Sequence, residues 1–332
     1  MPKSRTRPML FALLVSGCLI AAVVAVVAGA TGRHTNPQAS AAAAGVLPAA
    51  QAARTPMVVS RTKGGAGPGQ VELSPLGGSA GAPTRAALSC DRVYFSGGRG
   101  LCLAQGGGFA AGYKARVFGP DLRVRHELDV AGVPSRARVS PDGRYGAVTL
   151  FVTGHSYAAA GTFQTQTTLI DMATGEKLGD LEQFSVSKDD RQVTAVDVNF
   201  WGVTFARDSD EFYATMATGG KTYLIRGSVG RHTARVLYEN VECPSLSPDG
   251  KRIAYKKRVG RGATWRLTVL DLATLRETPL AETRSVDDQA EWLDGRHVLY
   301  GVDGAVWSVT ADGSGRPTRF LAQADSPAVV RW

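Results

Sequence analysis

Short apolar runs alternate with polar turns through most of the chain, and one turn sequence occurs twice. Ser140-Pro141-Asp142-Gly143 and Ser247-Pro248-Asp249-Gly250 each precede a short apolar run. Proline presets φ at the second turn position, aspartate can accept a hydrogen bond from the backbone two residues on, and glycine tolerates the closing conformation. The pattern therefore predicts a β-hairpin at each site.

The two copies remain similar beyond the turn. Residues 169–174 of the first copy, Leu-Ile-Asp-Met-Ala-Thr, correspond to residues 269–274 of the second, Val-Leu-Asp-Leu-Ala-Thr. The first copy is longer by seven residues, and the extra length falls in the small and polar stretch at 153–161. We expect this stretch to be an enlarged loop on one repeat.

Weaker copies of the unit extend the repeat along the chain. Phe205 begins one and Trp292 another, so the turn anchors at Val139, Phe205, Leu246 and Trp292 are 66, 41 and 46 residues apart. Periods of ~40 to 50 residues are typical of four-stranded propeller blades. A fifth unit spans 93–129 without the turn motif.

The predicted fold is therefore all-β: a β-propeller of five to six four-stranded blades. A sixth blade requires the C-terminal residues 328–332 to pair with a strand from the N-terminal side, such as 57–60. Closure by both chain ends would remove the exposed edge strand.

The repeated turn, followed by a strand and then the aspartate hairpins at Asp171 and Asp271, resembles the TolB-like family of β-propellers, also described as WD40-like. The resemblance covers roughly residues 88–332. It implies an exported propeller but identifies no binding site, because the motif is a turn. Residues 31–87 are too short and too rich in Ala, Gly and Pro for the family's additional N-terminal domain, so the family's partners do not carry over.

The N-terminus predicts export. Lys3, Arg5 and Arg7 precede an uncharged stretch from Met9 to Ala30, which is long enough to cross a bilayer as a helix. The stretch fits a retained membrane anchor, a signal peptide cleaved near Ala30, or a lipoprotein signal lipidated at Cys18. Each alternative places the propeller outside the cytoplasm, anchored in the cytoplasmic membrane or secreted.

Three segments follow from these patterns: a signal peptide or anchor at 1–30, a disordered low-complexity linker at 31–87, and the propeller at 88–332. Residues 1–86 hold eight Lys and Arg but one acidic residue, Glu72, and so contribute +7 of the formal net charge of +9. The remaining residues are nearly neutral. A basic face for nucleic acid is therefore not predicted in the propeller.

The cysteines allow one obvious disulfide. Cys90 and Cys102 are close in sequence, and export permits a bond between them. A tight turn centred on Gly98-Arg99 would instead place Cys102 opposite Phe95, so the bond requires Cys90 to lie outside the strand. Cys243 is expected to be a buried free thiol, and the spacing supports no zinc site.

Sequences that resemble catalytic motifs lack the surrounding structure that such motifs need. Gly219-Gly220-Lys221-Thr222 is similar to the end of a phosphate-binding loop, but strands are expected on both sides, so a hairpin turn is the better interpretation. No catalytic residue, cofactor or metal site is predicted, and a non-catalytic protein- or ligand-binding or scaffolding module is favoured. The alternative is a hydrolase or lyase with its site in the central channel.

Candidate binding residues are chosen by their position before the expected first strands of blades and in the enlarged loop. Strand ends and loops on a rigid scaffold commonly carry recognition. The partner is expected to be an envelope protein or a cell-wall component, bound by a monomer that also contacts the membrane through its N-terminal helix. The candidates are His155, Tyr157, Asp197, Asn199, Trp201, Asp287 and Asp288.

Overall fold

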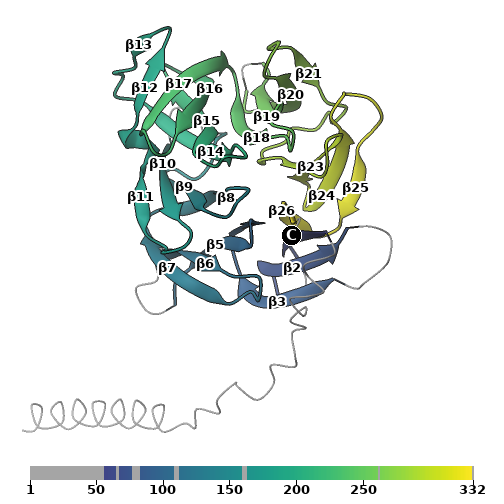
Figure 1. Ribbon diagram of the computed structural model, residues 1–332. Helices are drawn as coiled ribbons and strands as arrows, with labels where there is room; N and C mark the ends of the chain where they lie inside the picture. Colours follow the sequence, from purple (N-terminus) through teal and green to yellow (C-terminus); the bar gives the residue numbers. More distant parts are fainter. Residues whose placement is uncertain are drawn as a thin grey trace, which may run out of the picture. The chain divides into compact units, whose positions relative to one another are not determined.

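Six sheets of antiparallel strands surround a common axis in the computed structural model (Figure 1). The structure describes residues 56–64, 67–76, 83–107, 112–158, 163–260 and 262–330. In these ranges the only helical element is a single 3-10 turn, η1 (Leu181–Gln183). The protein is therefore an all-β propeller with six blades, the higher of the two predicted numbers.

No helix in the described ranges has the length and apolar character needed to cross a membrane. The predicted signal or anchor at 1–30 lies outside the described residues. Its role stays a prediction.

Four blades follow one plan, in which four consecutive strands run from the channel to the outer edge. Blade 1 is β4 (Arg92–Ser96), β5 (Arg99–Gln105), β6 (Tyr113–Phe118) and β7 (Val124–Val130). Blade 2 is β8 (Val133–Val139), β9 (Tyr145–Thr153), β10 (Gln164–Asp171) and β11 (Lys177–Asp180). Blade 4 is β18 (Glu242–Leu246), β19 (Arg252–Arg258), β20 (Trp265–Asp271) and β21 (Glu277–Pro279). Blade 5 is β22 (Glu291–Trp292), β23 (His297–Val302), β24 (Ala305–Thr310) and β25 (Thr318–Leu321).

Blade 3 has two extra strands at its outer edge. Its regular strands are β14 (Asn199–Phe205), β15 (Glu211–Thr218), β16 (Lys221–Ser228) and β17 (Thr233–Glu239). The segment that precedes them adds β12 (Ser185–Lys188), parallel to β17, and β13 (Arg191–Gln192). The exposed edge is thus reduced to two polar residues, which disfavours pairing with another chain.

Both ends of the propeller sequence form blade 6. The C-terminal strand β26 (Ala324–Val330) is innermost and pairs with β1 (Met57–Thr62), followed by β2 (Gln70–Pro75) and β3 (Thr84–Ser89). Val59 lies opposite Ala328, so the predicted closure is confirmed. In Figure 1 the yellow β26 lies at the inner edge of the sheet whose outer strands are the blue β2 and β3.

This blade corrects the predicted boundary at residue 88. The expected linker over 31–87 is wrong from Met57 onward, because Val58, Val59 and Val71 are buried in blade 6. Glycine-rich turns separate these strands and obscure them in the composition.

The two copies of the repeated turn have the same hydrogen bonds. In the first, the Ser140 hydroxyl donates to Asp142, and the Asp142 carboxylate accepts from the backbone of Arg144. Ser247 and Asp249 do the same in the second. Each turn joins the first and second strands of its blade, as predicted.

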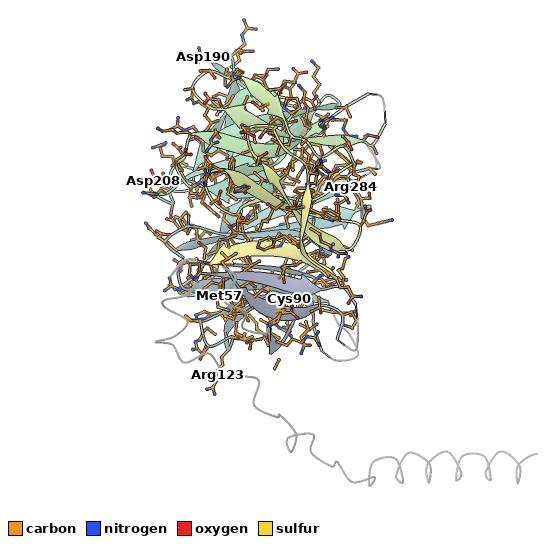
Figure 2. All side chains as sticks on the ribbon, turned by 90° about the vertical axis from the view of Figure 1, so that its right-hand side faces the viewer. Met57, Cys90, Arg123, Asp190, Asp208 and Arg284 are labelled. Atoms are coloured by element: carbon orange, nitrogen blue, oxygen red, sulfur yellow. A yellow bond between two sulfur atoms is a disulfide. The ribbon has the colours of Figure 1, made fainter. Side chains whose placement is uncertain are left out.

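Apolar side chains pack mainly between neighbouring blades. One cluster joins Tyr145 and Leu169 of blade 2 to Phe205 and Phe212 of blade 3. Figure 2 shows the edge-on view, in which polar side chains such as Asp190 and Arg123 project from opposite ends of the molecule. The blades are therefore held together mainly by apolar contact, while charged side chains project from the outer surface.

A disulfide joins Cys90 to Cys102, with their Cα atoms 5.5 Å apart. The expected strand register was wrong by two residues, because Gly97 and Gly98 form the turn and Cys102 lies opposite Val93. Cys90 precedes β4, outside the strand, which is the condition the sequence set for this bond. Cys243 is buried and unbonded to another cysteine.

Candidate binding site

Charged residues gather at one end of the channel, where the inner strands begin. Arg92 of β4 donates to the backbone oxygen of Ser135 in β8, and Arg138 of β8 donates to the backbone oxygen of Ala290, next to β22. The first contact joins neighbouring blades 1 and 2, and the second crosses the channel from blade 2 to blade 5. The charged residues of the inner strands at this end are Arg92, Arg136, Arg138, Glu242, Glu291 and Asp325. We call this end the channel mouth.

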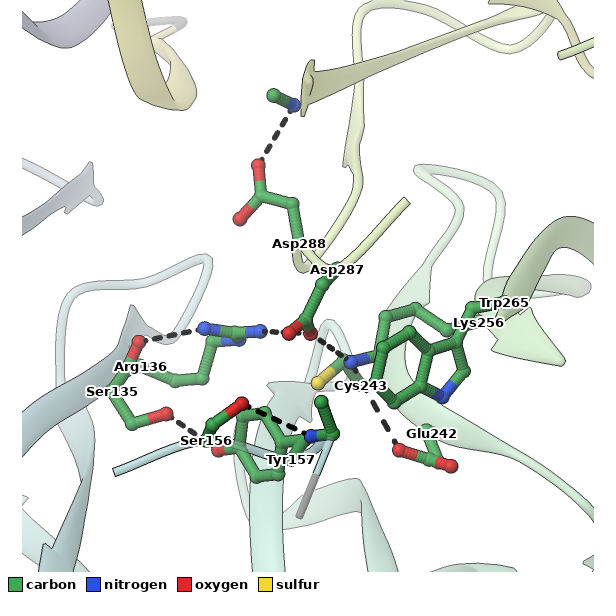
Figure 3. A network of polar contacts seen from close by, with 12 residues as sticks. Ser135, Arg136, Ser156, Tyr157, Glu242, Cys243, Lys256, Trp265, Asp287 and Asp288 are labelled. Atoms are coloured by element: carbon green, nitrogen blue, oxygen red, sulfur yellow. Dashed lines mark hydrogen bonds and ion pairs between the residues drawn. The ribbon is translucent and has the colours of Figure 1, made fainter. Parts of the chain in front are cut away.

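One half of the mouth is filled by an aromatic and ionic network, the closed half (Figure 3). Lys256 of β19 is fully buried, pairs with Asp287, and lies 3.9 Å from Glu242. Its ammonium is 4.3 Å from the centre of the Trp265 ring and 4.8 Å from that of Tyr157. Both aromatic faces and both carboxylates stabilise the buried cation.

Tyr157 ties the enlarged loop of blade 2 into this network. Its hydroxyl lies 2.5 Å from that of Ser135, and its ring packs against Trp201 at 5.2 Å between centres. The Arg136 guanidinium lies over the same ring. Burial raises the pKa of the Tyr157 phenol, so it remains a neutral hydrogen-bonding group.

The other half of the mouth is a cavity of about 210 Å³, which we call the vestibule. Its lining is mainly polar, with three small apolar residues. A void of about 20 Å³, the size of one water, lies deeper and shares Arg92, Asp288 and Ser326 with the vestibule. The charged residues of the vestibule are Lys63, Arg92, Asp287, Asp288, Asp303 and Asp325.

Most of these charges are paired within the protein. Asp325 accepts two hydrogen bonds of 2.8 Å from Arg61 and lies 3.2 Å from Lys63. Asp303 pairs with Arg284 at 3.1 Å. The carboxylates of the vestibule rim are therefore largely neutralised.

Arg92 and Asp288 differ from the rest of the lining. Arg92 donates to the backbone oxygens of Ser135 and Asp91, and Asp288 accepts from the backbone nitrogen of Gly301 at 2.8 Å. Across the described ranges, neither has an ion-pair partner within 4 Å. One positive and one negative charge thus remain unpaired in the same two cavities.

Asp287 and Asp288 are neighbours in sequence but face different surroundings. Figure 3 shows Asp287 between Arg136 and Lys256, whereas Asp288 points the other way. Burial acts to raise the pKa of Asp287, but the charges of Lys256 and Arg136 outweigh it and the pKa is lowered. Burial raises the pKa of Asp288, and the charges of Arg136 and Arg92 offset it only in part.

A larger cavity of about 520 Å³ lies between β3 and β5, beside the disulfide. All of its charged residues are paired inside the protein: Arg61 and Lys63 with Asp325, Arg61 also with Asp91, and Arg116 with Glu127. The vestibule is smaller but keeps charges available to a ligand, so it is the stronger candidate.

The structure does not place all predicted binding residues on a common surface. Trp201 and Tyr157 are only 1% and 2% exposed. The prediction that these two side chains contact a partner is therefore wrong, because both are packed inside the closed half. Asn199 is a bridge between blades, since it accepts from the backbone of Thr165 and donates to that of Phe163.

The remaining four predicted binding residues, unlike Trp201 and Tyr157, are at least partly exposed. His155 is exposed in the loop between β9 and β10. Asp197 is exposed but accepts from Thr218 and Gly219, which fixes the β15–β16 hairpin. Of the predicted set, Asp287 and Asp288 are the two that line the vestibule.

The sequence reasoning missed Arg92, Arg136 and Lys256. A signal existed for the two arginines, because a charged residue lies within the first four positions of five of the six inner strands, whereas Lys256 lies inside a second strand, β19. Charge in a buried strand is unusual and needs a partner or a function.

Comparison with known proteins supports the fold. No protein-family model and no curated protein matches the sequence. Among solved structures, the chain is similar to TolB from Acinetobacter baumannii, with a TM-score of 0.52 and 17% identity over 82% of this chain and 66% of that one. A chain of a nidogen/laminin complex gives a TM-score of 0.55 at 11% identity, over 82% of this chain and 98% of that one.

A puromycin-hydrolyzing peptidase of Mycobacterium tuberculosis gives a TM-score of 0.50 at 15% identity, over 81% of this chain. This chain spans 45% of the peptidase and just under two thirds of TolB. At these identities the likeness establishes the propeller fold, which binding proteins and enzymes share.

Proposed function

We propose that the protein is a non-catalytic binding module of the cell envelope, and that the vestibule is its binding surface. The observation that carries this proposal is the pair of unpaired charges, Arg92 and Asp288, in a cavity at the channel mouth. Most charges around them are paired, so these two are set apart by their environment.

Energetics favour a ligand at this place. An ionic group held in a partly buried site without a partner is destabilising, and a ligand that supplies the partner recovers that energy on binding. Arg92 lies in strand β4, and Asp288 lies in a loop next to Asp287, which is held by Lys256 of the closed half. Both charged groups are therefore held in place before a ligand binds. Such preorganisation reduces the entropy lost on association.

The envelope location rests on two features. The positive residues and uncharged stretch at the N-terminus predict export, and the Cys90–Cys102 disulfide is typical of oxidising compartments. Protease added to intact spheroplasts should digest or release the propeller. Full protection would contradict an extracytoplasmic location.

Photocrosslinking in intact cells tests the binding surface. A diazirine analogue of valine would replace Val302, which lines the vestibule, or Val124, an exposed residue of outer strand β7, as the matched control. We expect a specific adduct from position 302 and none from position 124. Adducts of equal yield at both positions, or none at 302, would contradict the proposal.

A further inference from the structure

We propose that the vestibule binds a small zwitterion of the α-amino-acid class, with its ammonium at Asp288 and its carboxylate at Arg92. This inference rests on the proposed function and specifies the ligand. It follows from the two unpaired charges, the size of the cavity and the unbonded Nε of Arg136 in the small void next to it.

The two unpaired charges have opposite sign and line the same space. Asp288 keeps a carboxylate oxygen free of any bond to a cation, and Arg92 bonds only to backbone oxygens, in the ranges the structure describes. A simple anion would meet Asp288 and Asp287, whereas a cation would meet Arg92 and Arg136. A ligand that carries both charges satisfies both groups at once.

Arg136 also favours a carboxylate at the Arg92 end of the ligand. Arg136 is 6% exposed, and its Nε has no hydrogen-bond partner in the described part of the chain, while its Nη2 reaches only Asp287, at 3.5 Å. It lines the deeper void together with Arg92 and Arg138. Buried guanidinium donors without acceptors are rare and costly, and a carboxylate is the acceptor that fits them best.

The volume limits the ligand to a small molecule. Sites for drug-sized ligands are ~300 to 1,000 Å³, and the vestibule is about 210 Å³. Its apolar lining consists of Val302, Ala305 and Ala324. A short aliphatic side chain would contact these residues, so glycine and alanine are suitable probes.

A carbohydrate is a poorer fit. No aromatic residue in the described ranges lines the vestibule. Tyr94 lines the small void, where it bonds to Glu291, and Tyr157, Trp201 and Trp265 are packed into the closed half. The lining therefore provides charge for recognition but no ring face for a sugar to stack on.

Isothermal titration of the purified full chain with L-alanine tests the proposal. Propionate lacks the ammonium, and ethylamine lacks the carboxylate, so each keeps one of the two charges. We expect saturable binding of L-alanine and affinity ~10- to 100-fold weaker for either analogue, as expected for loss of a hydrogen bond to a charged group. Equal affinity for an analogue, or no saturable binding of alanine, would overturn the proposal.

Two matched variants locate the site. Asp288→Asn should weaken alanine binding ~10-fold or more, whereas Asp190→Asn, the same change at an exposed turn outside the vestibule, should leave it within ~2-fold. Unchanged binding by Asp288→Asn would overturn the assignment. The analogue series needs no variant, so it remains decisive if Asp288→Asn folds poorly.

The two proposals can fail separately. If position 302 captures a partner but alanine does not bind, the binding module stands and the zwitterion is wrong. If alanine binds but no adduct forms, the ligand stands and the envelope partner is wrong.

Discussion

The two halves of the channel mouth use charge in opposite ways. In the closed half, Lys256 is enclosed by Asp287, Glu242 and two aromatic rings, so its burial is compensated inside the protein. In the vestibule, Asp288 and Arg92 have no ionic partner in the described ranges. The halves meet at residues 287 and 288: both aspartates line the vestibule, but only Asp287 is paired with cations of the closed half.

The difference shows how one scaffold divides stability from recognition. Pairing every charge in the closed half fixes the positions of blades 2 to 5 relative to one another. Leaving two charges unpaired in the vestibule sacrifices some stability and keeps polar groups available to a ligand. The first three predictions below test this division from the largest expected effect to the smallest.

The largest loss of stability is expected for Trp201→Ala in the closed half. Trp201 is buried against Tyr157 and Phe163, and removal of an aromatic side chain from a core costs ~3 to 5 kcal/mol. Urea unfolding measures the change. Trp307→Ala is the control, since Trp307 is only partly buried and should give a clearly smaller loss.

Lys256→Met should cost about 3 kcal/mol, the lower end for a broken buried pair, because Glu242 and Asp287 lose their shared cation and keep only Arg258 and Arg136. Lys257→Met is a close control. Lys257 is adjacent but partly exposed, and its pair with Glu277 should contribute ~0 to 1 kcal/mol. Equal losses for the two lysines would show that the closed half does not depend on the buried cation.

Replacing both Cys90 and Cys102 by serine tests whether the disulfide contributes only to stability or also to ligand binding in the vestibule. The bond closes a short segment of a hairpin that is already paired, so we expect a loss near the lower end of the usual ~2 to 4 kcal/mol. Alanine binding should persist in the folded variant, because neither sulfur lines the vestibule. Loss of binding without unfolding would mean that the disulfide positions Arg92.

Local signals in the sequence were sufficient to predict most of the fold. The turns at Ser140 and Ser247 and the hairpins at Asp171 and Asp271 are encoded within a few residues, and the pairing of the chain ends followed from the need to close a ring. The register of the β4–β5 hairpin could not be predicted in this way, because the three consecutive residues Gly97, Gly98 and Arg99 allow turns at different positions. Both glycines have positive φ in the structure, which selects the turn between them.

The candidate site was predictable only in part. Asp287 and Asp288 were identified because they precede an inner strand. Arg92, Arg136 and Lys256 come from three blades, and only closure of the ring brings the two arginines to one void and Lys256 to the Asp287 that Arg136 also contacts. Trp201 was misjudged because the sequence does not show whether an aromatic at a strand start faces the channel or the next blade.

The most direct test of the division between the halves compares Asp287→Asn with Asp288→Asn by urea unfolding between about pH 2.5 and pH 8. The lowered pKa of Asp287 means that its stabilising effect is present above its unfolded-state value of ~3.9 and is lost as pH falls through the folded value. Since Asp287 is partly exposed and Lys256 keeps Glu242, Asp287→Asn should cost roughly 2 kcal/mol at pH 7, less than loss of a fully buried pair, and the cost should shrink in acid.

The raised pKa of Asp288 gives the opposite sign. Its contribution is favourable below the unfolded-state value and is lost as pH rises through the folded value, so Asp288→Asn should be as stable as the natural chain or more stable at pH 7. That advantage should disappear in acid. Equal destabilisation by the two substitutions at pH 7 would contradict the account, because it would place both aspartates in the same paired environment.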